Sequence, residues 1–108
     1  MLAFENLSGN TPMIRIHYRY AGKTRSLYAK LESFNPSGSI KDRVAAYILN
    51  QAWQCGQLYP GQPIVEVSSG NTGIAFAALG AMSGHPVHIF MPDHVSLERR
   101  RLLEMYAA

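Results

Sequence analysis

The stretch Ile64-Val65-Glu66-Val67-Ser68-Ser69-Gly70-Asn71-Thr72-Gly73, followed by an apolar run from Ile74 to Met82, decides the fold. The first four residues are rich in β-branched side chains, which favour a short strand. A polar loop separates them from a run that is apolar all round, which is typical of a buried helix closed by Gly84. Residues 87–91 predict another strand, and Ser96 can cap a last helix. Strand, helix, strand, helix implies an α/β fold with a parallel sheet and flanking helices.

A β-hairpin is predicted upstream of this unit. Residues 14–20 alternate apolar and polar side chains, which is the period of a half-buried strand. The apolar positions expected to be half-buried are Ile14, Ile16, Tyr18 and Tyr20. Residues 21–24 supply a turn, and residues 26–32 return as a second strand.

A helix is predicted between the hairpin and the first parallel strand. Ser39 is a natural N-cap with Asp42 three residues on, in the manner of a capping box, and the helix runs to about Gln54 before Gly56. Its buried stripe is expected at Val44, Ala45, Ile48, Leu49 and Ala52. The last helix should turn Leu97, Leu103 and Tyr106 inward. Because its pattern reaches Ala108 without a Gly or Pro stop signal, we expect the sequence to be truncated there.

Composition excludes several classes of function. Ten basic and seven acidic residues give a net charge of +3, which suits an anionic ligand and is weak evidence for nucleic acid. The side chains of Arg99, Arg100 and Arg101 would fan around a helix, so a solvated face is expected rather than a phosphate-binding patch. No stretch approaches the roughly 18 apolar residues of a membrane helix. Residues 1–10 lack the basic start and the apolar run of a signal peptide, so a cytoplasmic location is expected and no membrane partner.

Cysteine and histidine predict no metal site. Cys55 stands alone, so an intrachain disulfide is impossible, and a half-buried structural thiol is expected. The histidines show no zinc-ligand spacing and are expected at the surface or half-buried; they are residues 17, 85, 88 and 94.

Lys41 is the first candidate for chemistry. By the capping argument it lies in the first turn of a helix, where the partial positive charge of the helix N-terminus disfavours a cation. The same field would favour the neutral amine, which is the form that makes a Schiff base with an aldehyde. A surface lysine turned to water is the alternative from position alone.

The loop from Ser68 to Gly73 is the second candidate. It joins the carboxyl end of a strand to a helix N-terminus, where free backbone N–H groups favour an anion. Its hydroxyls and the Asn71 amide add donors. The pattern is neither a P-loop nor Gly-x-Gly-x-x-Gly, so a carboxylate or other small anion is the better prediction than a dinucleotide. A plain capping loop is the alternative.

Four motifs occur in series along the sequence. They are Gly9-Asn10-Thr11-Pro12, the run Asn35-Pro36-Ser37-Gly38-Ser39-Ile40-Lys41-Asp42-Arg43, Ser68 to Gly73, and Met91-Pro92-Asp93 followed by Ser96-Leu97-Glu98-Arg99-Arg100. Together they resemble the cysteine synthase (O-acetylserine sulfhydrylase) and cystathionine β-synthase family of pyridoxal-phosphate enzymes, which has the tryptophan-synthase-β-like fold. The resemblance spans residues 5–108.

The resemblance implies a role for each candidate residue. Lys41 matches the lysine that holds the cofactor, and Asn71 matches the asparagine that hydrogen-bonds the oxygen of its ring hydroxyl. The loop that grips the substrate α-carboxylate is matched by Ser68, Ser69, Gly70 and Thr72. It also implies that residues 1–34 are the N-terminal hairpin segment of a large domain and residues 35–108 part of a smaller α/β domain.

The implied reaction is β-replacement that forms L-cysteine from O-acetylserine and sulfide. A homodimer is expected for the full-length enzyme. Family members are roughly three times as long, and their cofactor-phosphate loop lies downstream of the region matched here. A cystathionine β-synthase-type activity and a non-catalytic α/β fragment stay open, as do the leaving group and the sulfur donor.

Overall fold

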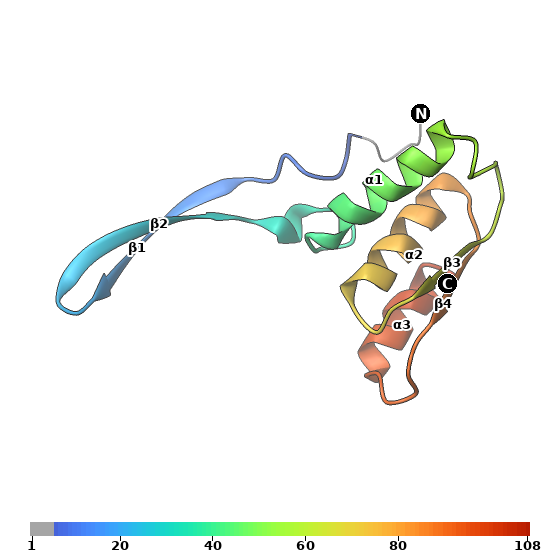
Figure 1. Ribbon diagram of the computed structural model, residues 1–108. Coiled ribbons are helices and arrows are strands. Elements are labelled where there is room, and N and C mark those ends of the chain that lie inside the picture. Colours follow the sequence, from blue (N-terminus) through green and yellow to red (C-terminus); the bar gives the residue numbers. More distant parts are fainter. Residues whose placement is uncertain (1–5) are drawn as a thin grey trace.

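The computed structural model describes residues 6–108, and they form a body from which a long hairpin projects (Figure 1). The hairpin, called the arm below, consists of β1 (Met13–Tyr20) and β2 (Lys23–Lys30). A single 3-10 turn, η1 (Glu32–Phe34), connects it to the body. The elements of the body are α1 (Lys41–Gln54), β3 (Ile64–Val67), α2 (Asn71–Ser83), β4 (Val87–Phe90) and α3 (Leu97–Met105). The predicted fold class is confirmed: an α/β unit with a parallel sheet follows a hairpin.

The body is built around α2. Strands β3 and β4 pair in parallel, with Ile64 opposite Val87, and α2 is the connection between them. Residues Gly73 to Gly80 are all buried, because α2 packs against α1, α3 and both strands. Helices α1 and α2 run side by side in the same direction (Figure 1). The left-handed conformation at Gly84 (φ 77°) ends α2, as predicted.

The buried face of α1 differs from the predicted stripe. Ala45 and Leu49 are buried as expected, but Val44 and Ile48 are each 47% exposed. The other buried residue of the helix is Asp42, which was not part of the predicted stripe. The reason is that α1 is covered on one side alone, by α2, within the described residues.

Two further expectations about burial are wrong. Leu97 is 56% exposed because it is the first residue of α3, whereas Leu103 is buried and Tyr106 partly buried, as predicted. Cys55 is exposed rather than half-buried, since it follows the last turn of α1 at the surface.

The predicted hairpin forms, but it is not half-buried. Its turn is Ala21-Gly22 rather than residues 21–24, and its second strand is Lys23–Lys30 rather than residues 26–32. Ala21 and Gly22 both have positive φ (49° and 74°), which suits the two-residue turn between twisted strands. Register pairs Tyr20 with Lys23 and Ile16 with Leu27. Ile14, Ile16, Tyr18 and Tyr20 are 41%, 40%, 39% and 70% exposed. Among residues 6–108, neither strand contacts any helix or strand other than its partner, which explains why the expected burial is absent.

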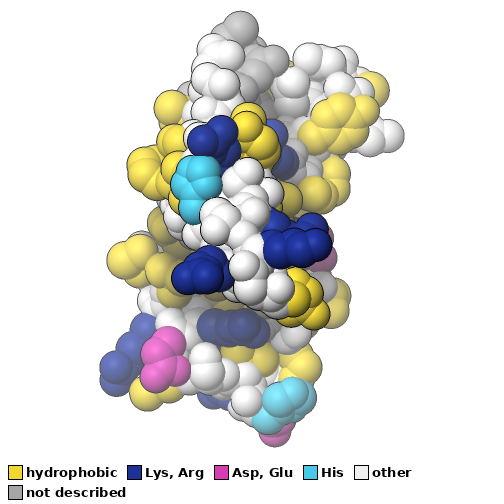
Figure 2. All heavy atoms as spheres, turned by 90° about the vertical axis from the view of Figure 1, so that its left-hand side faces the viewer, with side chains coloured by type: hydrophobic (Ala, Val, Ile, Leu, Met, Phe, Trp, Pro, Cys, Tyr) yellow, Lys and Arg dark blue, Asp and Glu magenta, His cyan; other side chains and the backbone are white. Residues whose placement is uncertain are grey.

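The projecting arm makes the molecule elongated. The radius of gyration is 16.8 Å, whereas about 13 Å is usual for a compact chain of this length. Figure 2 looks at the side to which the arm points and shows Lys and Arg side chains spread down that face. The arm carries no acidic residue; its basic residues are Arg15, Arg19, Lys23, Arg25 and Lys30. No helix in the described part of the chain is long and apolar enough to cross a membrane.

Candidate functional site

The turn that precedes α1 places Lys41 at the first position of that helix. Its side chain is exposed, and its backbone N–H donates to the Ser39 hydroxyl over 3.2 Å. The predicted capping box does not form, because Asp42 accepts from the backbone N–H (2.6 Å) and the hydroxyl of Ser37 instead. A turn closed by the Gly38 N–H on the Asn35 carbonyl (2.8 Å) brings Ser37 within reach of this carboxylate. Asp42 is fully buried, so it holds the turn from the inside.

The loop before α2 is held by Ser68. The Ser68 hydroxyl oxygen accepts from the backbone N–H groups of Gly70 (3.2 Å) and Gly73 (3.0 Å). Gly73 is closely packed, because a Cβ there would lie 3.2 Å from both Ser68 Cβ and Ile89 Cγ2 and would require one of them to shift slightly. The Ser68 side chain therefore accepts from two backbone N–H groups where α2 begins.

The rest of the loop faces outward at the start of α2. Asn71 is exposed and Thr72 partly buried, and both lie in the first turn, where backbone N–H groups have no partner within the helix. The carbonyl of exposed Ser69 accepts from Arg99 Nη1 over 2.7 Å, which ties the loop to α3. A threonine hydroxyl and an exposed asparagine amide at a helix N-terminus are suited to an anion.

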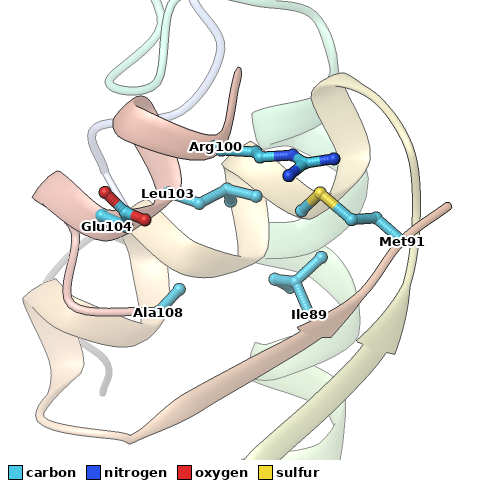
Figure 3. A pocket seen from close by; sticks show the side chains of 6 residues that line it. All are labelled: Ile89, Met91, Arg100, Leu103, Glu104 and Ala108. Carbon is cyan, nitrogen blue, oxygen red and sulfur yellow. The ribbon is translucent and has the colours of Figure 1, made fainter. Parts of the chain in front are cut away.

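Lys41 and the loop lie at the same end of the body. Figure 1 shows α1 and α2 starting side by side near the base of the arm. Two of the cavities in the described part of the chain are lined by residues other than Lys41 and residues 68–73. One, of about 180 Å³, lies between β4 and α3 and is shown in Figure 3. The other, of about 280 Å³, includes Ser8, Arg43 and Tyr47. Lys41, Ser69 and Asn71 are exposed, and Ser68, Gly70 and Thr72 are partly buried.

A polar network beside Lys41 was missed by the sequence analysis. Arg43 grips Glu32 with two nitrogens, Nε to Oε2 (2.8 Å) and Nη2 to Oε1 (3.0 Å). The Thr11 hydroxyl donates to Glu32 Oε1 (2.6 Å), and Asn35 Nδ2 donates to Glu32 Oε2 (2.8 Å). These hydrogen bonds, first of all those from Arg43 and Thr11, lower the pKa of Glu32 from 4.5 to about 2. The same pair raises the pKa of Arg43.

A signal for this network was present in the sequence. Two of the quoted motifs, residues 9–12 and 35–43, contain Thr11, Asn35 and Arg43, and Glu32 is the acidic residue between them. An opposite charge placed between two polar motifs indicates an ion pair that joins them.

The remaining candidates behave as structural or surface groups. The side chains of Arg99, Arg100 and Arg101 are exposed, as expected for a solvated face. His85 is buried rather than half-buried: its Nδ1 contacts the Gln62 carbonyl (2.9 Å) and its ring meets Trp53 edge-on at 6.2 Å. Within residues 6–108, no group of three or more His, Cys, Asp or Glu side chains is arranged to hold a metal ion.

Comparison with known proteins decides the family. The model of the family described as pyridoxal-phosphate dependent enzyme matches residues 4–108. The chain belongs to this family. Its members use pyridoxal phosphate, and the resemblance to cysteine synthase predicted from the four motifs is confirmed.

Three relatives illustrate the range of similarity. Cysteine synthase B of Escherichia coli is 38% identical over 108 residues, which are 100% of this chain and 36% of that protein. O-ureido-L-serine synthase of Streptomyces lavendulae is 46% identical over 98 residues, or 91% of this chain and 30% of that protein. The crystal structure of a hydrogen sulfide-producing enzyme from Fusobacterium nucleatum has a TM-score of 0.91 at 50% identity and covers 97% of this chain and 31% of its own. The chain thus spans about a third of the length of these relatives.

Proposed function

We propose that this chain supplies the cofactor-holding lysine and the substrate-carboxylate loop of an enzyme that forms L-cysteine from O-acetylserine and sulfide by β-replacement. One observation carries the proposal. In a chain of the pyridoxal-phosphate dependent family, Lys41 begins one helix and the Ser68–Gly73 loop begins the next, at the same end of the body (Figure 1).

The side chains of Lys41 and Asn71 have the chemistry needed to bind the aldehyde and the ring hydroxyl of the cofactor. Lys41 offers an exposed amine that can be joined to an aldehyde, and Asn71 offers an exposed amide for a ring hydroxyl oxygen. Pyridoxal phosphate, when bound, supplies an electron sink for the substrate α-carbon. The proposed task of the Lys41 amine is to hold the cofactor and then to remove the proton from the α-carbon.

The loop is proposed to bind the substrate α-carboxylate. Ser69, Gly70 and Thr72 lie at the N-terminus of α2, whose partial positive charge favours an anion. Ser68 has a narrower proposed role. Because its oxygen already accepts from Gly70 and Gly73, it keeps those N–H groups oriented and has its hydroxyl hydrogen for the carboxylate.

The finer assignments are part of the same proposal. Relatives named cysteine synthase and O-ureido-L-serine synthase support β-replacement on a small amino acid, and they differ in their named products. A cystathionine β-synthase-type reaction is the alternative. We further propose that residues 1–34 belong to a large domain and residues 35–108 to a smaller one, in a homodimer of the whole protein in the cytoplasm. Residues 1–5 of the first segment lie outside the described residues.

The proposal is tested by adding pyridoxal phosphate and recording the visible spectrum before and after reduction with borohydride. The lysine-linked cofactor should give a visible band, and mass spectrometry should find the reduced adduct on Lys41. Lys41→Ala should remove the band, whereas Lys23→Ala, a matched change at an exposed lysine of the arm, should keep it. An adduct spread equally over the lysines, or a band unchanged in Lys41→Ala, would contradict the proposal.

A further inference from the structure

We propose that Arg43 is a positioning residue, which locks the first turn of α1 to the base of the arm through Glu32. The inference rests on the proposed function in one respect, namely that the turn so held is the one that carries Lys41. Arg43, Glu32, Thr11 and Asn35 are called the latch below.

The ion pair between Arg43 and Glu32 is bidentate, unlike a single-point contact at the surface. Two Arg43 nitrogens reach the two Glu32 oxygens at 2.8 and 3.0 Å. The Glu32 side chain is 18% exposed and that of Arg43 39%, so the pair is partly shielded from water. Paired planar groups of this kind fix direction as well as distance, in contrast to single-point surface ion pairs.

The latch ties together both chain segments that enter the arm. Thr11, just before β1, donates its hydroxyl to Glu32 Oε1 (2.6 Å), and Lys30 at the end of β2 donates to the Thr11 carbonyl (2.6 Å). The backbone of Leu31 also donates to the Pro12 carbonyl (2.8 Å). The arm cannot swing on either segment without disturbing Glu32.

Asn35 carries the connection from Glu32 to the lysine turn. It is 3% exposed, and its amide nitrogen lies 2.8 Å from Glu32 Oε2 and 3.0 Å from the Ser39 carbonyl. Its amide oxygen accepts from the Gly9 N–H at 2.8 Å. Gly9 has a φ of 85°, which favours glycine, and a Cβ there would lie 2.9 Å from Arg43 Nη1, so the guanidinium would have to shift.

Lys41 is followed directly by two anchored residues, Asp42 and Arg43. Asp42 is held from the inside by Ser37, and Arg43 from the outside by Glu32. The Lys41 side chain itself is exposed. The backbone that carries the amine is therefore fixed by its neighbours, while the amine stays accessible. A lysine in place of Arg43 would keep the positive charge but could not make the bidentate contact with Glu32. Arg43→Lys should therefore hold the first turn of α1 less firmly than arginine does.

The first test measures orientation. Residual dipolar couplings of the arm and of the body should fit one alignment in the unmodified chain. In Arg43→Ala they should require two separate alignments, with the β1–β2 pairing and the α1–α2 packing retained. Arg43→Lys should fall between the two, and Thr11→Val, which removes one hydroxyl of the latch, provides a milder variant. Separate alignments in the unmodified chain, or a shared alignment retained in Arg43→Ala, would overturn the proposal.

The second test asks whether the latch serves Lys41. Borohydride reduction in the presence of pyridoxal phosphate gives the ratio of adduct on Lys41 to adduct on Lys23. Arg43→Ala should bring this ratio toward one, and an unchanged ratio would contradict the positioning role. If the unmodified chain shows a shared alignment but labels both lysines equally, the latch stands and the proposed function fails, so the two failures are distinguishable.

Discussion

The arm and the body use the same apolar residue types with opposite results. Leu79 in α2 is 0% exposed, whereas Leu27 in β2 is 44% exposed. Ile74 is 6% exposed, whereas Ile14 and Ile16 are 41% and 40% exposed. The difference is the number of surfaces around each element: α2 is covered by two helices and two strands, and each strand of the arm touches its partner alone among the described elements.

The comparison shows that the two faces of the hairpin are set by residues close in sequence, whereas burial of a face is not. Pairing places Ile14 opposite Ala29 and Ile16 opposite Leu27, so one face of the arm is apolar near its base. Arg15, on the next position of β1, lies on the other face. Alternation specifies these two faces, but burial requires a second layer, which neighbouring residues in the sequence do not provide.

The largest expected change in stability comes from a matched pair of leucine-to-alanine substitutions, one in the body and one in the arm. Leu79→Ala should lower the free energy of unfolding of the body by about 2–5 kcal/mol, because it leaves a cavity at the centre of the core. Leu27→Ala should cost less than about 1 kcal/mol, since the side chain is already partly in water. Urea denaturation followed by circular dichroism measures both values. Equal losses would mean that the arm is buried in solution.

Much of the fold follows from the sequence for the same reason. Residues 64–67 and 87–90 are short apolar strands, and the run around Leu79 is apolar on every side, so it can be stable solely when surrounded. The wrong predictions concern which face of an element is buried. The predicted stripe through Val44 and Ile48 gave the correct helix but not its burial, since the position of α2 relative to α1 is a property of tertiary packing.

An intermediate effect is expected from two glycine substitutions. A Cβ at Gly80 would lie 2.3 Å from Val87 Cγ2 and 3.4 Å from the His85 carbonyl oxygen, so Gly80→Ala should destabilise the body by about 1–3 kcal/mol despite the better helix propensity of alanine. Gly22→Ala meets no atom within 4 Å, and its cost of about 1 kcal/mol should come from the positive φ of 74°.

Thermal unfolding of the two variants sharpens the contrast between arm and body. Hydrogen exchange should locate the loss from Gly80→Ala in α2 and β4, and that from Gly22→Ala in β1 and β2. Faster exchange throughout both regions in either variant would show that arm and body unfold as one unit.

The candidate site was predictable where it depends on helix starts and not where it depends on long-range contacts. Lys41 and Asn71 do begin helices, as the capping and loop patterns predict. The predicted capping box between Ser39 and Asp42 was wrong, because a turn at Gly38 brings Ser37 within reach of Asp42 instead. Glu32 and Arg43 are 11 residues apart with an irregular turn between them, so no helical or strand period relates them. The roles of Lys41 and Asn71 toward the cofactor remain predictions.

The smallest expected effect is a pH dependence that originates where arm and body meet. The folded-state pKa of Glu32, about 2, lies below its ordinary value of 4.5. The contribution of Glu32 to stability is therefore complete above about pH 4.5 and is lost as the pH falls toward about 2. Glu32→Gln lacks this carboxylate, so its stability should fall less steeply through that window.

The difference in stability between the unmodified chain and Glu32→Gln isolates the contribution of Glu32, because the other carboxyl groups titrate in both proteins. Urea midpoints measured at several pH values should lie furthest apart above pH 4.5 and converge as the pH approaches 2. Curves that stay parallel through this window would mean that Glu32 is not held by Arg43 in solution. The arm and the body would then lack this ion pair, although Thr11 and Asn35 could still bind Glu32, and the contrast between the two regions would extend to their relative motion.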